Sequence, residues 1–214
     1  MRTEVLTPQA QAIFPQLSHF RDDFYLAGGT GLALQIGHRV SVDFDLFSPL
    51  PIKKTLLKKV EEVFSVVSQQ ILVNNSSELT MRIDGVKCTF LHYPFPLLMP
   101  LHEGNPLPLL SVKECIITKA YTIGRRGEFK DYIDMYIGLN DNHIHLAEVL
   151  DGASKKYGGA FNDRLFLEQL LYFDDVESVE IVLLGGGATP SKSVLLEYFN
   201  TVVAESAIVM GKPQ

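Results

Sequence analysis

Hydrophobic positions are spaced differently in the two halves of the chain. In the first half, apolar residues three and four apart predict a short helix over residues 8–20, and the run Phe-Tyr-Leu-Ala predicts a buried strand over 24–27. A glycine pair follows, and residues 30–37 then favour a helix that ends at a glycine. Residues 41–47, Ser-Val-Asp-Phe-Asp-Leu-Phe, are typical of another strand.

The rest of the first half predicts one more helix and a β-hairpin. Two prolines near residue 50 precede an amphipathic helix that carries four lysines within 53–59. Residues 78–83 and 86–93 are β-rich and are joined by Asp84-Gly85. An Asp-Gly pair between such runs favours a two-residue turn, so these segments are expected to form antiparallel strands.

The second half has helical spacing. Five prolines between residues 94 and 108 mark a connector. Ser-Val-Lys-Glu at 111–114 is a capping-box pattern, so a helix begins near Val112, and helical periodicity continues to about residue 172. A glycine-rich turn and a final helix follow. We therefore expect an α+β fold in three parts: a mixed α/β core over 1–95, a proline-rich connector over 96–110 and a helical domain over 111–214.

Composition and charge narrow the class of protein. The chain has 214 residues, of which 46% are hydrophobic and 21% are charged, so it can bury a sizeable core. Its net charge of −6 argues against a surface built for non-specific nucleic-acid binding, although it permits a local basic site. The two cysteines lack disulfide or zinc spacing, and no segment reads as a signal peptide or approaches the ~20 apolar residues of a membrane span. We expect a soluble, cytoplasmic protein.

Two aspartates, Asp43 and Asp45, occupy alternate positions of the strand predicted around them. Their side chains project from one side, with Cα atoms ~6.5–7 Å apart, while Val42, Phe44 and Leu46 point to the other side. Paired carboxylates repel one another and are costly to bury, and a divalent cation such as Mg²⁺ removes that cost. Taken alone, however, the pair is more simply explained as the solvent-facing side of a strand.

A glycine-rich turn upstream changes this balance. Gly28, Gly29 and Thr30 stand between a predicted strand and a predicted helix. Glycines let the backbone approach a ligand closely, and the N–H groups at a helix N-terminus attract phosphate. A phosphate cradle followed by an Asp-x-Asp strand suits a nucleotidyltransferase, because one element holds the triphosphate and the other holds metal ions.

The chain closely resembles a known family in three stretches. The most diagnostic is LAGGTGLALQIGHRVSVDFDLFS, residues 26–48; the others are ITKAYTIGRRGEFKDYIDMY, residues 117–136, and LLYFDDVES, residues 170–178. These resemble AbiEii/AbiGii-type nucleotidyl transferases, toxins of type IV toxin–antitoxin and abortive-infection systems within the DNA polymerase β-like superfamily. The resemblance implies a polymerase β-like mixed sheet with flanking helices, followed by a C-terminal helical region.

The resemblance also implies roles for individual residues. In the first stretch it implies phosphate binding by Gly28, Gly29 and Thr30, metal binding by the catalytic pair Asp43 and Asp45, and a place near the triphosphate for Arg39 and Ser41. In the second stretch, Lys119 matches a nucleotide-contacting lysine, and Asp134 matches a catalytic aspartate that acts as a general base or organises the site. Asp131 shares a helix face with Asp134, and Lys130 flanks them. Because both belong to the resembling stretch, the resemblance implies that they contribute to nucleotide binding.

The implied reaction is transfer of a nucleoside monophosphate (NMP) from an NTP to an acceptor hydroxyl, dependent on Mg²⁺ or, alternatively, Mn²⁺. The implied acceptor is RNA, at the 3′ end of tRNA, and the implied partner is a cognate antitoxin. One departure weakens this reading, because Thr89 stands where relatives in the wider superfamily commonly have a third carboxylate. A small-molecule or protein acceptor, and a catalytically degenerate nucleotide-binding protein, therefore stay open as alternatives.

Three other features favour simpler explanations. His143 and His145 could ligate a metal, but such a pair more often marks an exposed loop or a helix start. The glycine-rich segment at 183–193 lacks the residue order of a phosphate loop and is expected to be a turn. The lysines within 53–59 are either solvated or contact a phosphate backbone, and the sequence leaves this open.

Overall fold

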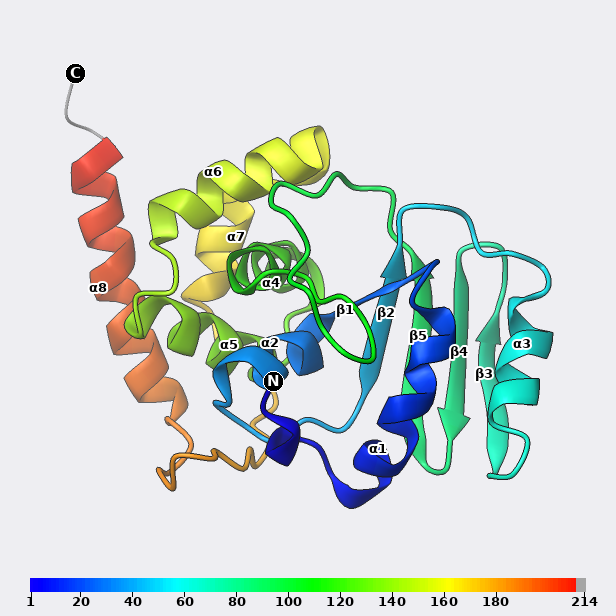
Figure 1. Cartoon of the computed structure of the whole chain (residues 1–214). Helices are drawn as coiled ribbons and strands as arrows, with labels where there is room; N and C mark the ends of the chain where they lie inside the picture. The colour runs from blue at the N-terminus through cyan, green and yellow to red at the C-terminus, as the bar shows by residue number, and fades with distance from the viewer. Residues whose placement is uncertain (211–214) are drawn as a thin grey trace. The chain divides into compact units, whose positions relative to one another are not determined.

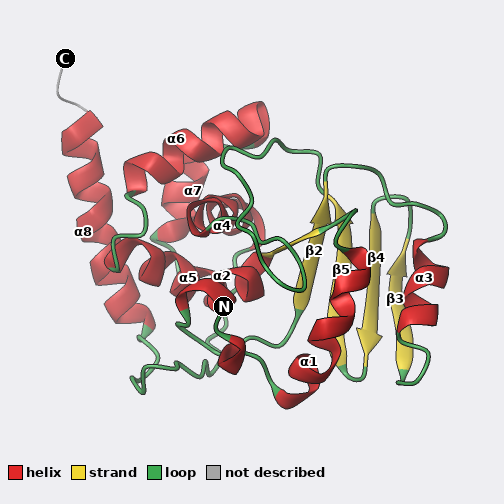
Figure 2. Ribbon diagram, viewed as in Figure 1, coloured by secondary structure: helices red, strands yellow, loops and turns green. Residues whose placement is uncertain are grey.

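The computed structural model describes residues 1–210, with side chains described up to residue 206. The chain forms two compact units, Met1–Ser111 and Val112–Gln214, which are described separately below. Their secondary structure is shown in Figure 2. None of the helices within residues 1–210 is long and apolar enough to cross a membrane.

The first unit is built on a five-stranded mixed sheet (Figure 1). Its strands lie in the order β1-β2-β5-β4-β3, in which β2 pairs with β5 in parallel and the other neighbours are antiparallel. The strands are β1 (Tyr25–Ala27), β2 (Phe44–Ser48), β3 (Gln69–Asn74), β4 (Glu78–Ile83) and β5 (Val86–His92).

Helices of the first unit cover one face of this sheet. They are the 3₁₀ helices η1 (Thr3–Val5) and η2 (Phe14–Phe20) and the α-helices α1 (Pro8–Ile13), α2 (Gly28–Ile36) and α3 (Leu56–Val63). Figure 1 shows α1 and α3 lying over the sheet. The Phe20 ring meets Phe90 of β5 edge-on at 4.9 Å, and the Phe14 and Phe44 rings stack at 5.5 Å, so η2 supplies much of the aromatic core.

The opposite face of the sheet carries polar side chains over much of β4, β5 and the start of β2, because side chains alternate along each strand. Phe44 and Leu46 of β2 are fully buried in the core, whereas Asp45 between them points to the other side. The paired register continues this division across β5 and β4. We call this side the polar face and define it by Asp43, Asp45, Glu78, Thr80, Arg82, Lys87 and Thr89.

The second unit is helical. It contains α4 (Val112–Arg126), α5 (Phe129–Asn140), α6 (Leu146–Tyr157), η3 (Gly158–Ala160), α7 (Asp163–Leu170) and α8 (Lys192–Met210). α4 packs against α5, α6 and α7. Two glycines allow a close approach to α4. A Cβ atom at Gly138 of α5 would lie 2.5 Å from the Ile116 side chain, and one at Gly152 of α6 would lie 2.5 Å from the Ile117 side chain.

Two buried groups of charges lie in this helical unit. Lys156 of α6 and Glu114 of α4 form an ion pair at 2.6 Å, and both side chains are 0% exposed. On the same helix α4, the Lys119 Nζ atom lies 2.7 Å from Asp131 and 2.8 Å from Asp134 of α5. Cys115 of α4 lies close enough to both groups to feel their charges. The pKa of its thiol is raised to about 12, chiefly by burial.

The structure differs from the sequence-based expectations at several points. The strand predicted over 41–47 begins only at Phe44, and Val42, expected on the apolar side, is 53% exposed. The helix predicted over 8–20 is an α-helix followed by a 3₁₀ helix, and Ala12 of its expected apolar stripe is exposed. Strand β3 was not predicted, because its exposed residues lack a regular apolar alternation.

The proline-rich segment 96–110 lies in the first unit, where the Leu26 amide donates a hydrogen bond of 2.8 Å to the Pro108 carbonyl oxygen. The mixed α+β architecture is confirmed. The division into a nucleotidyltransferase α/β core over 1–95, a connector over 96–110 and a helical domain over 111–214 stays a prediction.

Removing one member of the buried ion pair is expected to destabilise the protein. Lys156→Met leaves the Glu114 carboxylate buried without this cation and should lower the free energy of unfolding by about 3–5 kcal/mol. Glu114→Met/Lys156→Met, which removes both charges, should lose clearly less. Urea unfolding of the full chain, followed by circular dichroism, measures both.

The matched control is Lys155→Met, because Lys155 is an exposed neighbour on the same helix and pairs with Asp151 at 2.7 Å. An exposed pair contributes about 0–1 kcal/mol. Equal midpoints for the Lys155 and Lys156 variants would contradict this account of the buried pair.

Candidate functional site

The site in the first unit begins where β1 meets α2. Ala27, the last residue of β1, pairs in register with Asp45 of β2, so the chain enters α2 directly beside the Asp45 side chain. Gly28 has a φ of +64°, and a Cβ atom built there would lie 2.2 Å from Asp45 Oδ2. The Asp45 carboxylate therefore lies against the backbone of the first helical residue, and only glycine leaves room for it.

A buried network of hydroxyl groups fixes the other aspartate. The Thr30 hydroxyl donates to the main-chain carbonyl oxygen of Asp43, and the Ser41 Oγ atom lies 2.6 Å from Thr30 Oγ1. Arg39 Nη1 donates to the Val40 carbonyl oxygen at 3.1 Å and lies 3.5 Å from Ser41 Oγ. These contacts tie the start of α2 to the loop before β2, and they hold the backbone on which Asp43 stands.

Three residues expected near the phosphates thus lie in the interior. Thr30, Ser41 and Arg39 are 3%, 6% and 5% exposed, so the structure places them behind the aspartates as supports for the loop. Gly28 and Gly29 are only half-buried, and they leave the backbone at the start of α2 accessible. Of the predicted phosphate-binding residues, the two glycines are the more accessible to a ligand.

Asp43 and Asp45 are both half-buried and lie close enough to the buried Cys88 thiol to affect its pKa. Burial raises the pKa of Cys88 strongly, and the two carboxylates raise it further. No cluster of three or more His, Cys, Asp or Glu side chains that could hold a metal occurs within the described residues. A pair of carboxylates completed by water or phosphate oxygens fits Mg²⁺, which commonly takes one or two protein carboxylates.

Thr89 occupies the position next to Asp45. The parallel register of β2 and β5 pairs Asp45 directly with Thr89, and β4 places Thr80 beside Thr89. The Thr80 and Thr89 hydroxyl oxygens are 3.3 Å apart, and the Thr80 hydroxyl donates to Glu78 Oε1 at 2.6 Å. A carboxylate at residue 89 would thus adjoin the aspartate pair, and here a threonine linked to Glu78 through Thr80 stands in its place.

Three of the four predicted site residues of the second unit form a buried cluster. Lys119 bridges Asp131 and Asp134, and Asp134 has no exposed side-chain surface. Asp131 also accepts a hydrogen bond of 2.9 Å from the Glu128 amide, which makes it part of the capping box of α5. Lys130 pairs with Glu128 at 3.1 Å and lies outside this cluster.

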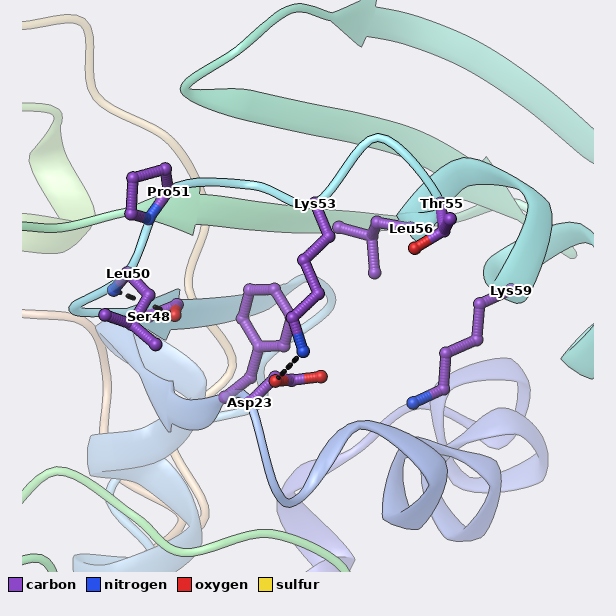
Figure 3. Close-up of a pocket in the computed structure, with 9 residues that line it drawn as sticks. Asp23, Ser48, Leu50, Pro51, Lys53, Thr55, Leu56 and Lys59 are labelled. Atoms are coloured by element: carbon purple, nitrogen blue, oxygen red, sulfur yellow. Dashed lines mark hydrogen bonds and ion pairs between the residues drawn. The ribbon is translucent and has the colours of Figure 1, made fainter.

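The remaining motifs have local explanations. His145 caps α6, with its amide donating to Glu148 Oε2 at 3.0 Å, as expected of a helix start. In the lysine-rich segment, Lys53 pairs with Asp23 at 2.6 Å beside a cavity of about 30 Å³ (Figure 3). Lys59 lies 5.2 Å from the centre of the Phe20 ring. The charges that border this cavity are therefore largely engaged within the protein.

Two solved structures resemble the chain over most of its length. The nucleotidyltransferase toxin MenT4 of Mycobacterium tuberculosis H37Rv gives a TM-score of 0.59 at 18% identity, over 94% of this chain and 81% of that one. A Helicobacter pylori protein described as a candidate nucleotidyltransferase gives 0.55 at 17% identity, over 94% and 91%. The fold is therefore that of the nucleotidyltransferases, and the predicted fold class is confirmed.

Sequence similarity then identifies the family. Residues 12–185 match the nucleotidyl transferase AbiEii toxins of type IV toxin–antitoxin systems. An uncharacterized protein of Aquifex aeolicus strain VF5 is 33% identical over 164 residues, which cover 72% of this chain and 75% of that protein. The chain belongs to the nucleotidyl transferase AbiEii toxin family. It is a nucleotidyltransferase, as its resemblance to this family implied, and α8 lies beyond the matched residues.

An alanine at residue 28 tests the close contact with Asp45. Gly28→Ala places a side chain in left-handed backbone, at a cost of about 1–2 kcal/mol, and also overlaps the Asp45 carboxylate, which adds about 1–3 kcal/mol. Gly85→Ala is the matched control, because Gly85 has a φ of +82° and open space around it. Thermal unfolding of the full chain should show the larger loss for Gly28→Ala. Equal losses would mean that the overlap with Asp45 costs nothing.

Proposed function

We propose that this nucleotidyltransferase transfers an NMP from an NTP to an RNA hydroxyl, at the 3′ end of tRNA, in a reaction that requires Mg²⁺ or Mn²⁺. The observation that carries the proposal is the pair Asp43 and Asp45, half-buried on the polar face and directly beside the glycine turn that opens α2. The pair supplies oxygen ligands, and the turn supplies main-chain N–H groups for phosphate.

In this proposal each element has a separate task. Asp43 and Asp45 would hold the divalent ion, which would neutralise charge on the triphosphate and lower the pKa of the acceptor hydroxyl. The backbone at Gly28 and Gly29 binds and orients the triphosphate. The acceptor hydroxyl attacks the α-phosphorus, the bond to the bridging oxygen breaks, and pyrophosphate leaves while the acceptor proton passes to a base.

The roles of the second unit follow from the family resemblance. Lys119 is proposed to supply the positive charge that contacts the nucleotide. Asp134, matched to the family's catalytic aspartate, is proposed to act as general base or to organise the site by holding Lys119. Their 2.8 Å contact supports a paired role, because the carboxylate fixes the position of the ammonium group. Lys130 and Asp131 are proposed as nucleotide-binding residues, with Asp131 acting through its contact with Lys119.

The partner that restrains such a toxin is an antitoxin, as membership of a type IV toxin–antitoxin family implies. Thr89 favours one competing function, a nucleotide-binding protein without transferase activity, because it removes a carboxylate from the position beside Asp45.

The reaction is tested with α-labelled NTPs, Mg²⁺ and total RNA. The wild-type chain should label tRNA, and Asp43→Asn or Asp45→Asn should each reduce labelling more than about 100-fold, since even outer-shell partners of a metal are worth about 10–100-fold. Asp22→Asn, an exposed residue of the same unit, controls for the change in charge. NTP binding without transfer to any acceptor would support the degenerate protein, and label on protein or a small molecule would replace the RNA acceptor.

A third carboxylate beside Asp45 is expected to strengthen metal binding. Thr89→Asp places one in register with Asp45 on the neighbouring strand, and Mn²⁺ affinity measured by electron paramagnetic resonance should rise roughly tenfold, because affinity follows the number of charged ligands. Thr89→Asn has a similar size and no charge and should leave the affinity unchanged. If Thr89→Asp binds Mn²⁺ no more tightly than Thr89→Asn, the ion is not held at the proposed position.

A further inference from the structure

Two exposed basic side chains extend the polar face away from the aspartates. Arg82 of β4 and Lys87 of β5 are directly opposite one another in the antiparallel register. On β5, Lys87 stands two residues before Thr89, so the two side chains share a face of the sheet. Thr89 pairs in register with Asp45 of β2. Lys87 and Arg82 therefore lie opposite one another on the side of the sheet that carries Asp45 and Thr89, two positions along β5 from the residue in register with Asp45.

This arrangement of like charges is unfavourable by itself. Opposed cross-strand side chains have Cβ atoms about 4.5–5.5 Å apart, and two like charges at that separation destabilise a sheet. Within the described part of the chain, Lys87 forms no ion pair within 4 Å. Arg82 Nη1 donates to the Gly85 carbonyl oxygen at 3.0 Å, which holds the guanidinium at the β4–β5 turn. An anionic ligand would offset the repulsion between Arg82 and Lys87.

The position of the pair separates it from the triphosphate. β2 lies between β1, which leads into the glycine turn, and β5, which carries Lys87. The phosphates of the NTP are assigned to the glycine turn on the β1 side of Asp45. Anions bound by Lys87 and Arg82 would lie on the β5 side, away from the glycine turn.

We propose that Lys87 and Arg82 bind backbone phosphates of a single-stranded RNA acceptor and direct its terminal hydroxyl toward Asp43. This inference rests on the proposed function and adds the residues that hold the acceptor. Neighbouring strands are about 4.8 Å apart, so two flexible basic side chains on β5 and β4 can contact successive phosphates of one strand. A cationic small molecule would be repelled here, which makes an anionic polymer the fitting acceptor.

RNA binding is measured without NTP, using the full chain and a labelled single-stranded RNA at several salt concentrations. The variant Arg82→Glu/Lys87→Glu should weaken binding at least roughly tenfold and reduce the salt slope by about 1.4, since each phosphate contact to a single strand contributes about 0.7. Lys87→Met should remove about one contact. The binding of NTP, measured separately, should be unchanged in all variants.

Lys58→Glu/Lys59→Glu is the matched control, because it reverses two charges in the same unit on α3, which packs on the opposite face of the sheet. An equal loss of RNA binding in this control, or an unchanged salt slope in the Arg82 and Lys87 variants, overturns the inference. Wild-type protein that binds NTP and no RNA also overturns it. If the basic pair binds RNA but no NMP is transferred, the inference holds and the proposed reaction fails.

Discussion

The close approach of the Asp45 carboxylate to the backbone of Gly28 is the constraint on which the site of the first unit depends. Pairing of β1 with β2 fixes Ala27 opposite Asp45, and the chain then turns into α2 with no side chain in the way. The same turn starts the helix whose Thr30 hydroxyl supports the Asp43 backbone. One glycine thus positions both carboxylates relative to the main-chain N–H groups at the start of α2.

Sequence patterns anticipated much of this arrangement. The alternation through β2 correctly assigned Phe44 and Leu46 to the core and Asp45 to the other face. It failed at Val42, because the loop before β2 is held by hydroxyl contacts from α2 and no longer alternates. Gly28 was expected to make room for a ligand, whereas the structure shows that it first makes room for Asp45. The pairing of Ala27 with Asp45, which no local sequence pattern predicted, reveals that contact.

The buried charges of the second unit show a different limit of prediction from sequence. The spacing of Asp131 and Asp134 predicted a shared helix face, and both contact Lys119. No local pattern predicted the pairing of Glu114 with Lys156, because the two residues are far apart in sequence. Each belongs to an amphipathic helix, on which a charged residue is expected to face solvent. The hairpin of β4 and β5, by contrast, follows from a local pattern, because a two-residue turn at Asp84-Gly85 sets Arg82 opposite Lys87.

The polar face explains how a threonine can stand beside the aspartate pair in a member of this family. The backbone pairing of β2, β5 and β4 sets the positions of its residues, and their side-chain contacts are not the only constraint. A threonine at residue 89 therefore leaves the positions of Asp45, Thr80 and Glu78 unchanged. The face then offers the aspartate pair at the start of β2 and basic groups at Lys87 of β5 and Arg82 of β4, while Glu78 at the start of β4 is bound to Thr80. That division suits a reaction in which a metal-bound triphosphate and a polyanionic acceptor approach the same pair of carboxylates from opposite sides.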